Sequence, residues 1–189
     1  IRYLNLYQYN GSKTAYGFTM EGCTVRECYE ALISENKFNL KKQRSEALEF
    51  NKNNKYKKIG ISVVPLCFPN GFVFPQLNQG FATVSIYKDG SVKVFHGGTE
   101  MGQGLNTKMA QIAASILNIP IEKVEVRTSH TDHVPNSSPT AASSGADLNG
   151  GAIIQACETL RDRLKELREV EGRSWEETCQ LAYLNQIDL

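Results

Sequence analysis

Apolar and polar residues alternate at every second position over residues 82–96, and this is the clearest pattern in the chain. An Asp89-Gly90 pair interrupts the alternation near its midpoint, and Asp-Gly is typical of the turn of a β-hairpin. Alternation puts the apolar side chains on one face of a strand. The sequence therefore predicts a hairpin with one face in the core. Its inward-facing residues are Ala82, Val84, Ile86, Val92 and Val94.

Elsewhere apolar residues recur every three or four positions, which is the spacing of an amphipathic helix. The helices predicted in this way lie at 24–32, 39–51, 105–118 and 152–167, with a further helix that begins at 174. Thr24 with Glu27, and Ser174 with Glu177, each have the pattern of a capping box, in which two side chains satisfy backbone N–H groups of the first turn. Helix starts are therefore expected at both positions.

Two further segments, 59–68 and 123–128, are rich in strand-forming residues and are predicted to be strands. The order strand, strand, helix, strand, helix, preceded by helices, indicates an α+β fold in which a sheet containing the hairpin is backed by helices. The polar run at 51–55 is a natural boundary. We therefore expect a mainly helical lead-in segment at 1–57 and an α+β segment at 58–189.

The composition is that of an ordinary globular protein, and it narrows the classes of function. The 189 residues are 41% hydrophobic and 22% charged, and 21 Lys and Arg against 20 Asp and Glu give a formal net charge of +1. This balance provides no field to recruit nucleic acid or an anionic membrane. No apolar run approaches the roughly 18 residues of a membrane span, and the N-terminal residues lack a signal-peptide pattern. A cytoplasmic protein that binds neither nucleic acid nor membrane is expected.

Five cysteines and three histidines give little indication of a metal site. The cysteines are odd in number and widely spread in a chain too large to need disulfides, so reduced thiols are expected. Cys23 and Cys28 have a near-ligand spacing, but no second Cys or His pair follows, and Cys28 falls on the apolar side of its helix. Core packing is therefore the better interpretation. His96, His130 and His133 are scattered over strand ends and loops and are expected to lie on the surface.

Two small, polar stretches, at 96–108 and 130–151, each lead into a predicted helix. Backbone N–H groups at a helix start are unpaired, so a loop of Gly, Ser, Thr and Ala there lets a phosphate or another acceptor reach bare backbone. The alternative is that the glycines form a tight turn and that Ser or Thr caps the helix. The first stretch has four glycines around Gln103, more than a turn needs, which favours a ligand cradle. No Lys-Ser or Lys-Thr follows them, which excludes a Walker loop.

The same stretches carry a family resemblance. The run GGTEMGQGLNTKMAQIA, followed by VPNSSPTAAS and ADLNG, resembles the molybdenum-binding region of the xanthine dehydrogenase and aldehyde oxidase family, the molybdenum hydroxylases. The segments RYLNLY, EFNKNNKYKKIGISVVP, LNQG, YKDGSVKVFHGGTEMGQG and GRSWEE resemble the same region in the same order. The resemblance covers essentially the whole chain.

The resemblance implies a cofactor and the residues that bind it. Molybdenum hydroxylases carry molybdenum on a pterin dithiolene, molybdopterin, and hydroxylate purines, other heteroaromatics or aldehydes with oxygen from water. The family's pterin-binding positions correspond to Met101, Gly102, Gln103, Thr140, Ala141, Ala142 and Ser143. In the family, the backbone N–H matched by Ala142 approaches the ligand sphere of the metal. Phe72 and Val73 correspond to substrate-binding positions.

The resemblance also implies parts that lie outside this chain. These are the family's general-base glutamate, further cofactor-binding residues, the 2Fe-2S clusters and FAD. We therefore expect a fragment of a much longer, homodimeric enzyme, inactive without the rest of the polypeptide. Val73 stands where purine-oxidising members have a polar residue, so the substrate range is expected to extend from purines to other aromatics and aldehydes.

Two alternatives remain open. One is a working hydroxylase subunit completed by other chains. The other is a noncatalytic module that binds a phosphorylated small molecule or a pterin, or serves as a scaffold, without activity of its own. Molybdenum and pterin analysis separates an enzyme from a scaffold, because only the enzyme retains the cofactor. Phe72, judged without the resemblance, is equally well explained as a core aromatic.

Overall fold

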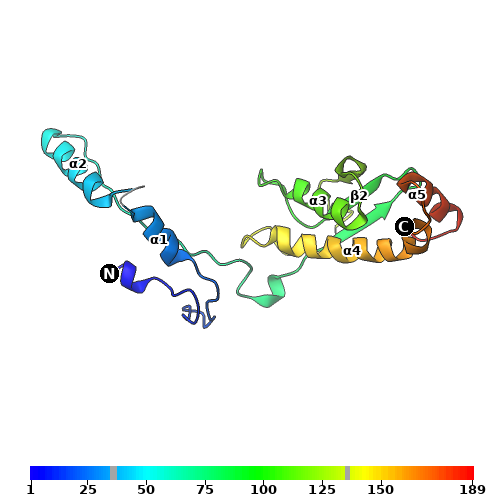
Figure 1. The fold of residues 1–189 in the computed structure, drawn as a ribbon, viewed down its shortest axis with the longest axis horizontal. Coiled ribbons are helices and arrows are strands. Elements are labelled where there is room, and N and C mark those ends of the chain that lie inside the picture. The colour runs from blue at the N-terminus through cyan, green and yellow to red at the C-terminus, as the bar shows by residue number, and fades with distance from the viewer. Residues whose placement is uncertain (35–37, 135–136) are drawn as a thin grey trace. The chain divides into compact units, whose positions relative to one another are not determined.

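The computed structural model describes residues 1–34, 38–134 and 137–189 (Figure 1). Pro135 and Asn136 of the VPNSSPTAAS motif lie outside the described residues. The chain packs as two units, Ile1–Phe68 and Pro69–Leu189, so this division lies C-terminal to the boundary expected after Lys57.

The first unit contains a 3-10 helix at Tyr3–Asn5 and the helices α1, Val25–Ile33, and α2, Leu40–Asn53. Asn39 caps α2, because its side chain accepts a hydrogen bond from the Lys42 N–H. Thr24 makes no such bond at α1, so the capping box predicted there is wrong.

Cys23 and Cys28, which were both expected to pack in a core, differ in their surroundings. Cys23 is buried, whereas Cys28 is exposed on α1. The prediction is therefore confirmed for Cys23 and wrong for Cys28, because the apolar side of α1 has little of the described chain packed against it. None of the residues of α1 is buried.

Residues 59–68 form no strand, contrary to the prediction. Val64, Leu66 and Phe68 are 60%, 84% and 78% exposed. A strand is stable only where a neighbour pairs its backbone N–H and C=O groups. Within the described part of the first unit this segment has no strand beside it. Its strand-forming residues therefore have no neighbouring strand with which their backbone could pair.

The second unit is an α+β layer, as predicted. Its described residues form a three-stranded sheet in the order β1-β2-β3. Strand β1, Ala82–Ile86, pairs antiparallel with β2, Val92–His96, and β2 pairs parallel with β3, Val124–Val126. The hairpin turn contains Gly90 at φ +83°, a conformation that glycine adopts without strain. The predicted hairpin and third strand are both confirmed.

Three helices complete this unit: α3, Leu105–Leu117, α4, Gly145–Arg168, and α5, Trp175–Leu184. The capping box of Ser174 and Glu177 at α5 is confirmed. Helix α4 begins at Gly145 and not near residue 152. The sequence did not reveal this start, because the first two turns are mostly small and polar, with Leu148 as their one large apolar residue and so no apolar period. One of them, Gly150, packs so close to α3 that an added Cβ would lie 2.8 Å from Ile112 Cδ1.

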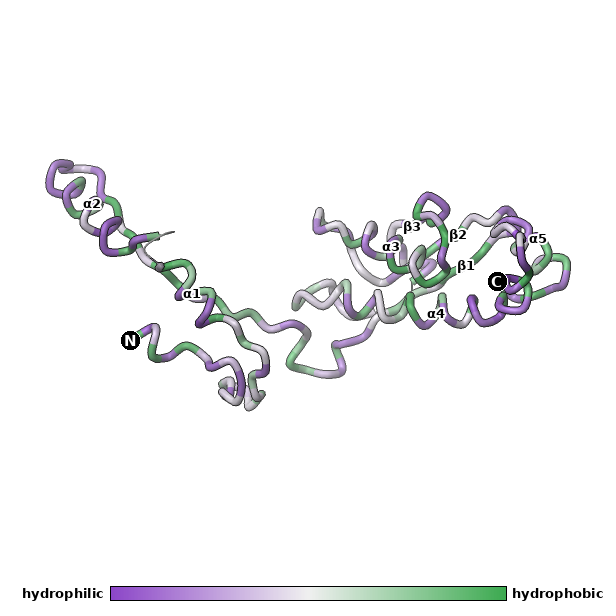
Figure 2. The backbone as a smooth tube through the Cα atoms, viewed as in Figure 1, coloured by the Kyte–Doolittle hydropathy of each residue, from purple (hydrophilic) through white to green (hydrophobic). Residues whose placement is uncertain are grey.

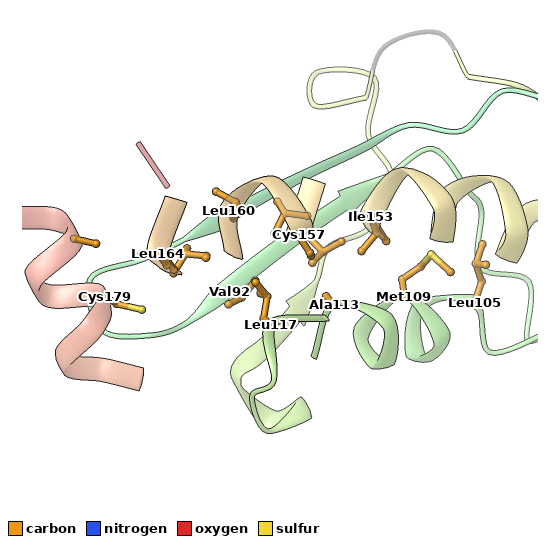
Figure 3. Close-up of a cluster of buried hydrophobic side chains, with 14 residues drawn as sticks. Val92, Leu105, Met109, Ala113, Leu117, Ile153, Cys157, Leu160, Leu164 and Cys179 are labelled. Atoms are coloured by element: carbon orange, nitrogen blue, oxygen red, sulfur yellow. The ribbon is translucent and has the colours of Figure 1, made fainter. Parts of the chain in front are cut away.

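The core of the second unit lies between the sheet and helices α3 and α4 (Figure 3). Helix α3 packs over β3, α4 packs over β1, and the two helices pack against each other. Hydrophilic and hydrophobic positions alternate in short stretches along α4, as expected of a helix with one buried face (Figure 2). In Figure 3, Leu105 to Leu117 and Ile153 to Leu164 run in the same direction. The loops that precede α3 and α4 therefore lie at the same end of the core.

Gly80 of the LNQG motif lies where its own backbone and the backbone of α4 come too close to leave room for a side chain. A Cβ at this position would lie 2.2 Å from the Leu148 carbonyl oxygen on α4, which cannot move aside as a flexible side chain can. We predict that Gly80→Ala lowers the free energy of unfolding by about 1–3 kcal/mol, measured by urea unfolding. Gly151→Ala is the control, because nothing lies within 4 Å of a Cβ there. It should stabilise α4 by about 0.5–1 kcal/mol. Equal effects of both changes would contradict this account.

Candidate functional site

Three loops of the second unit meet at the end of the core where α3 and α4 begin. We name them the Phe loop, residues 70–80, the glycine loop, residues 97–104, and the Ala-Ser loop, residues 140–144. The Thr99 N–H of the glycine loop donates to Thr140 Oγ1 at 2.8 Å. The Gly71 N–H of the Phe loop donates to the Ala142 carbonyl at 2.9 Å. Positions that the resemblance matched on three separate segments are thus brought together.

Glu100 organises the glycine loop from within. Its Oε1 accepts hydrogen bonds from the N–H groups of Gly102 and Gly104 at 2.9 and 3.0 Å, and its Oε2 accepts one from Asn106 at 2.9 Å. The bond from Asn106, and then those from the glycine N–H groups, hold the pKa of the Glu100 carboxyl below its ordinary value. A negative charge is also favoured by the dipole at the start of a helix. The N–H groups of Gly104 and Asn106, at the start of α3, are therefore bonded to a side chain of the loop itself.

Gln103 lies at the exposed tip of this loop, yet both ends of its amide are bonded to loop backbone. Its Oε1 accepts from the Met101 N–H at 2.6 Å, and its Nε2 donates to the Thr99 carbonyl at 3.0 Å. Gln103 therefore braces the loop from within, and the use of this stretch as a ligand cradle stays a prediction. The contact of Met101, Gly102 and Gln103 with a pterin stays a prediction.

The Ala-Ser loop has the opposite character, because its backbone is open. Ala142 and Ser143 both have left-handed backbone conformations, at φ +54° and +56°. Such values are uncommon for residues other than glycine and cluster at binding sites. Among the residues that the structure describes, the N–H groups of Ala142 and Ser143 have no hydrogen-bond acceptor. This loop of small residues therefore fits a ligand that accepts hydrogen bonds from backbone, as a pterin or phosphate does.

The Phe loop holds Phe72 by its backbone. Asn78 Oδ1 accepts from the Phe72 N–H at 2.8 Å, and Asn78 Nδ2 donates to the Phe72 carbonyl at 2.9 Å. Gly71, at φ +87°, makes the turn that this pairing requires. Phe72 itself is half-buried, and Val73 is 57% exposed. The ring of Phe72 is thus carried on a fixed backbone beside the Ala-Ser loop.

His96 is fully buried at the end of β2, so the expectation that it lies on the surface is wrong. Its Nδ1 accepts from the Gly98 N–H at 3.1 Å, so the ring is neutral with its proton on Nε2, 2.9 Å from Asn106 Oδ1. Burial lowers the pKa of His96 and keeps it in this form. His96 therefore links the base of the glycine loop to the first turn of α3.

Glu100, Asn78 and His96 are the three residues of this site whose roles the sequence did not reveal. A signal existed for Glu100, because an acidic residue just before a helix start is favoured by the helix dipole. Asn78 belongs to the LNQG motif, but nothing in the motif shows that the side chain reaches back to Phe72. His96 ends an alternating strand on its inward-facing register, and that register was the available sign of burial.

Protein side chains that bind metals directly do not gather in this unit. Among residues 1–34, 38–134 and 137–189, no three His, Cys, Asp or Glu side chains lie close enough to hold a metal ion. All five cysteines are free thiols, as expected. Burial raises the pKa of Cys157 to about 11 and that of Cys179 to about 12, so both are protonated core residues.

No helix in the described ranges is long and apolar enough to span a membrane.

The fold, with the glycine loop, the Ala-Ser loop and the Phe loop meeting at one end of the core, is that of a molybdenum-cofactor-binding segment. Residues 34–189 match the model of the molybdopterin cofactor-binding domain family, and the chain belongs to that family. Among curated proteins, it is 44% identical to xanthine dehydrogenase/oxidase of Gallus gallus and 41% identical to xanthine dehydrogenase of Dictyostelium discoideum. Both matches cover 100% of this chain and 14% of the relative.

Two solved structures share the fold. Quinoline 2-oxidoreductase from Pseudomonas putida 86 superposes with a TM-score of 0.70 at 25% identity, covering 93% of this chain and 26% of that one. CO dehydrogenase from Oligotropha carboxidovorans superposes with a TM-score of 0.55 at 17% identity, covering 87% of this chain and 24% of that one. The second likeness concerns the fold alone.

The two bonds from Asn78 predict how firmly Phe72 is held. Asn78→Ala removes the acceptor of the Phe72 N–H, so hydrogen exchange at that amide should become about tenfold faster or more. The measurement is amide exchange followed by NMR. Gln79→Ala is the matched control, because Gln79 is the exposed neighbour and bonds only within the turn, to the Gln76 carbonyl. Unchanged exchange in Asn78→Ala would show that other contacts fix the Phe loop.

Proposed function

We propose that this chain forms part of the molybdopterin cradle of a longer molybdenum hydroxylase. The observation that carries the proposal is the open backbone of the Ala-Ser loop, which is bonded both to the glycine loop and to the Phe loop. Molybdopterin supplies the redox chemistry by which heteroaromatics and aldehydes are hydroxylated with oxygen from water, and the protein supplies binding and orientation. The chain's own contribution is therefore to bind the pterin and to orient a substrate ring.

The residues divide between these two tasks. In this proposal the pterin is bound by Met101, Gly102, Gln103, Thr140, Ala141, Ala142 and Ser143. The Ala142 N–H, which faces no acceptor within the described residues, approaches the ligand sphere of the metal. An alanine suits this position because only its N–H is needed and a larger side chain would crowd the metal. Phe72 and Val73 line the substrate side.

The rest of the polypeptide supplies what this chain lacks. The chain spans 14% of the length of the xanthine dehydrogenase relatives. The proposal assigns the general base, the 2Fe-2S clusters, FAD and the remaining cofactor contacts to the other parts of a homodimeric, cytoplasmic enzyme. Proton abstraction needs a positioned base, so the isolated chain has no hydroxylase activity.

The second candidate function is a noncatalytic phosphate- or pterin-binding module. The same open N–H groups of Ala142 and Ser143 favour it, because they suit any anionic or acceptor ligand. The experiment that separates the two is to quantify molybdenum and pterin in the purified full-length protein and to assay it with a heteroaromatic and an aldehyde. One molybdenum and one pterin per chain with turnover supports the hydroxylase. Pterin without molybdenum, or neither, refutes it.

Ala142 gives a test that separates its backbone from its side chain. In the full-length protein, Ala142→Gly keeps the N–H and tolerates the left-handed conformation, so molybdenum content should stay within about twofold. Ala142→Val crowds the site and is strained at positive φ, so molybdenum content should fall about tenfold or more. Ala113→Val is the packing control, because Ala113 is fully buried in the core on α3. Equal molybdenum loss in both valine variants would argue against a cofactor role for Ala142.

Phe72 gives a test of the substrate class. A ring substrate stacked on Phe72 gains about 0.5–1.5 kcal/mol beyond the burial of area, whereas a small aliphatic aldehyde does not. In the full-length enzyme, Phe72→Ala should lower kcat/KM for heteroaromatics by about tenfold relative to acetaldehyde. Val73→Thr restores a hydroxyl beside the ring and should favour purines over other aromatics. If Phe72→Ala slows all substrates equally, Phe72 is a packing residue.

A further inference from the structure

The glycine loop holds its shape through one of its own exposed side chains. Glu100 folds back onto the loop, and its two carboxylate oxygens accept three backbone hydrogen bonds, each between 2.9 and 3.0 Å, from Gly102, Gly104 and Asn106. The backbone can wrap round the carboxylate because Gly102 and Gly104 have φ of +97° and +75°. A charged acceptor makes stronger hydrogen bonds than a neutral one. Removing it leaves three N–H groups without their acceptor.

Asn106 is held from two sides, which ties this arrangement to the core. Its N–H is bonded to Glu100, and its side-chain oxygen accepts from Nε2 of the fully buried His96 at 2.9 Å. His96 in turn accepts from the Gly98 N–H, so the loop is anchored at both of its ends. The segment between these anchors carries Met101, Gly102 and Gln103, which are all exposed.

The bonding of Glu100 also decides which groups are left for a ligand. Its carboxylate takes the N–H groups of Gly104 and Asn106 at the start of α3, so these two are not left for a phosphate. The tip of the glycine loop is left to make contact through Met101, Gly102 and Gln103. In contrast, the Ala-Ser loop leaves the N–H groups of Ala142 and Ser143 without an acceptor in the described part of the chain.

We propose that Glu100 is a positioning residue for the cofactor: its carboxylate, bonded to the backbone of its own loop, fixes residues 101–103 in the conformation that receives the pterin, without touching the pterin itself. This inference rests on the proposed function, because it needs a pterin at the loop tip. It assigns to Glu100 a role in cofactor affinity that the family-matched binding positions do not include.

The test measures cofactor retention in the full-length protein, with molybdenum and pterin quantified per polypeptide after dialysis. Glu100→Ala removes all three bonds and should lower retention by about tenfold or more. Glu100→Gln keeps one carbonyl oxygen, which can still accept from Gly102 and Gly104, so it should lose less than Glu100→Ala. A graded loss, with the glutamine variant in between, is the expected result.

Glu177→Gln is the matched control. Glu177 also accepts a backbone N–H at a helix start, from Ser174 at 2.9 Å, but on α5. Figure 3 shows Cys179 of α5 at the opposite end of the core from Leu105. This variant should lower the unfolding midpoint and leave cofactor retention unchanged. If Glu100 only stabilises the fold, cofactor retention should instead fall in proportion to the loss of stability in both Glu100→Gln and Glu177→Gln.

Three results would overturn the inference. Unchanged retention in Glu100→Ala would show that the loop needs no internal carboxylate. Increased retention would show that Glu100 competes with the ligand for the start of α3. Equal losses of cofactor retention in Glu100→Gln and Glu177→Gln would show that Glu100 acts only through stability. If Glu100→Ala fails to fold, Glu100→Gln provides the test. A wild-type protein without molybdenum or pterin refutes the proposed function itself, so the two failures are distinguishable.

Discussion

The close parallel packing of α3 against α4 is the constraint on which the second unit depends. Gly150 lies at this contact, where an added Cβ would lie 2.8 Å from Ile112 Cδ1 on α3 and would require that side chain to shift. Two helices that run in the same direction on one sheet begin at the same end of the core, and so do the loops that lead into them. Gly80 extends the same constraint to the Phe loop, whose backbone touches the Leu148 carbonyl on α4. The site is therefore a consequence of helix packing before any ligand is considered.

Periodicity predicted the elements that bury one face against a near neighbour. The hairpin and α3 were found because alternation and helical spacing report burial directly. Residues 59–68 show the limit of this reasoning. Val64, Leu66 and Phe68 have strand-forming side chains, but a strand also needs a neighbouring strand to pair with, and the sequence of the segment does not show whether one is present. The start of α4 was missed for the opposite reason, since Gly150 is buried against α3 without being counted as apolar.

The resemblance proposed the residues of the candidate site, whereas the hydrogen bonds that organise them were not visible in the sequence. The glycines drew attention to residues 96–108 as bare backbone, yet Glu100 occupies much of that backbone. The side chain of Asn78 reaches six residues back to Phe72, and His96 reaches ten residues forward to Asn106. Such bonds depend on which way a turn folds, and composition does not encode that direction. Buried His96 shows the same limit, because a neutral, fully bonded histidine packs like an apolar residue.

The two helix starts at this site illustrate two ways of treating the same unpaired N–H groups. At α3 the chain supplies its own anion, so the loop is ordered before any ligand arrives and little conformational entropy is lost on binding. At α4 the left-handed Ala142 and Ser143 keep their N–H groups open, at the cost of backbone strain. A ligand that accepts hydrogen bonds from the second loop recovers part of that cost, and it meets the first loop already in shape. Because Thr99 and Thr140 join the two loops, a ligand of the Ala-Ser loop would lie beside a glycine loop whose backbone is already bonded.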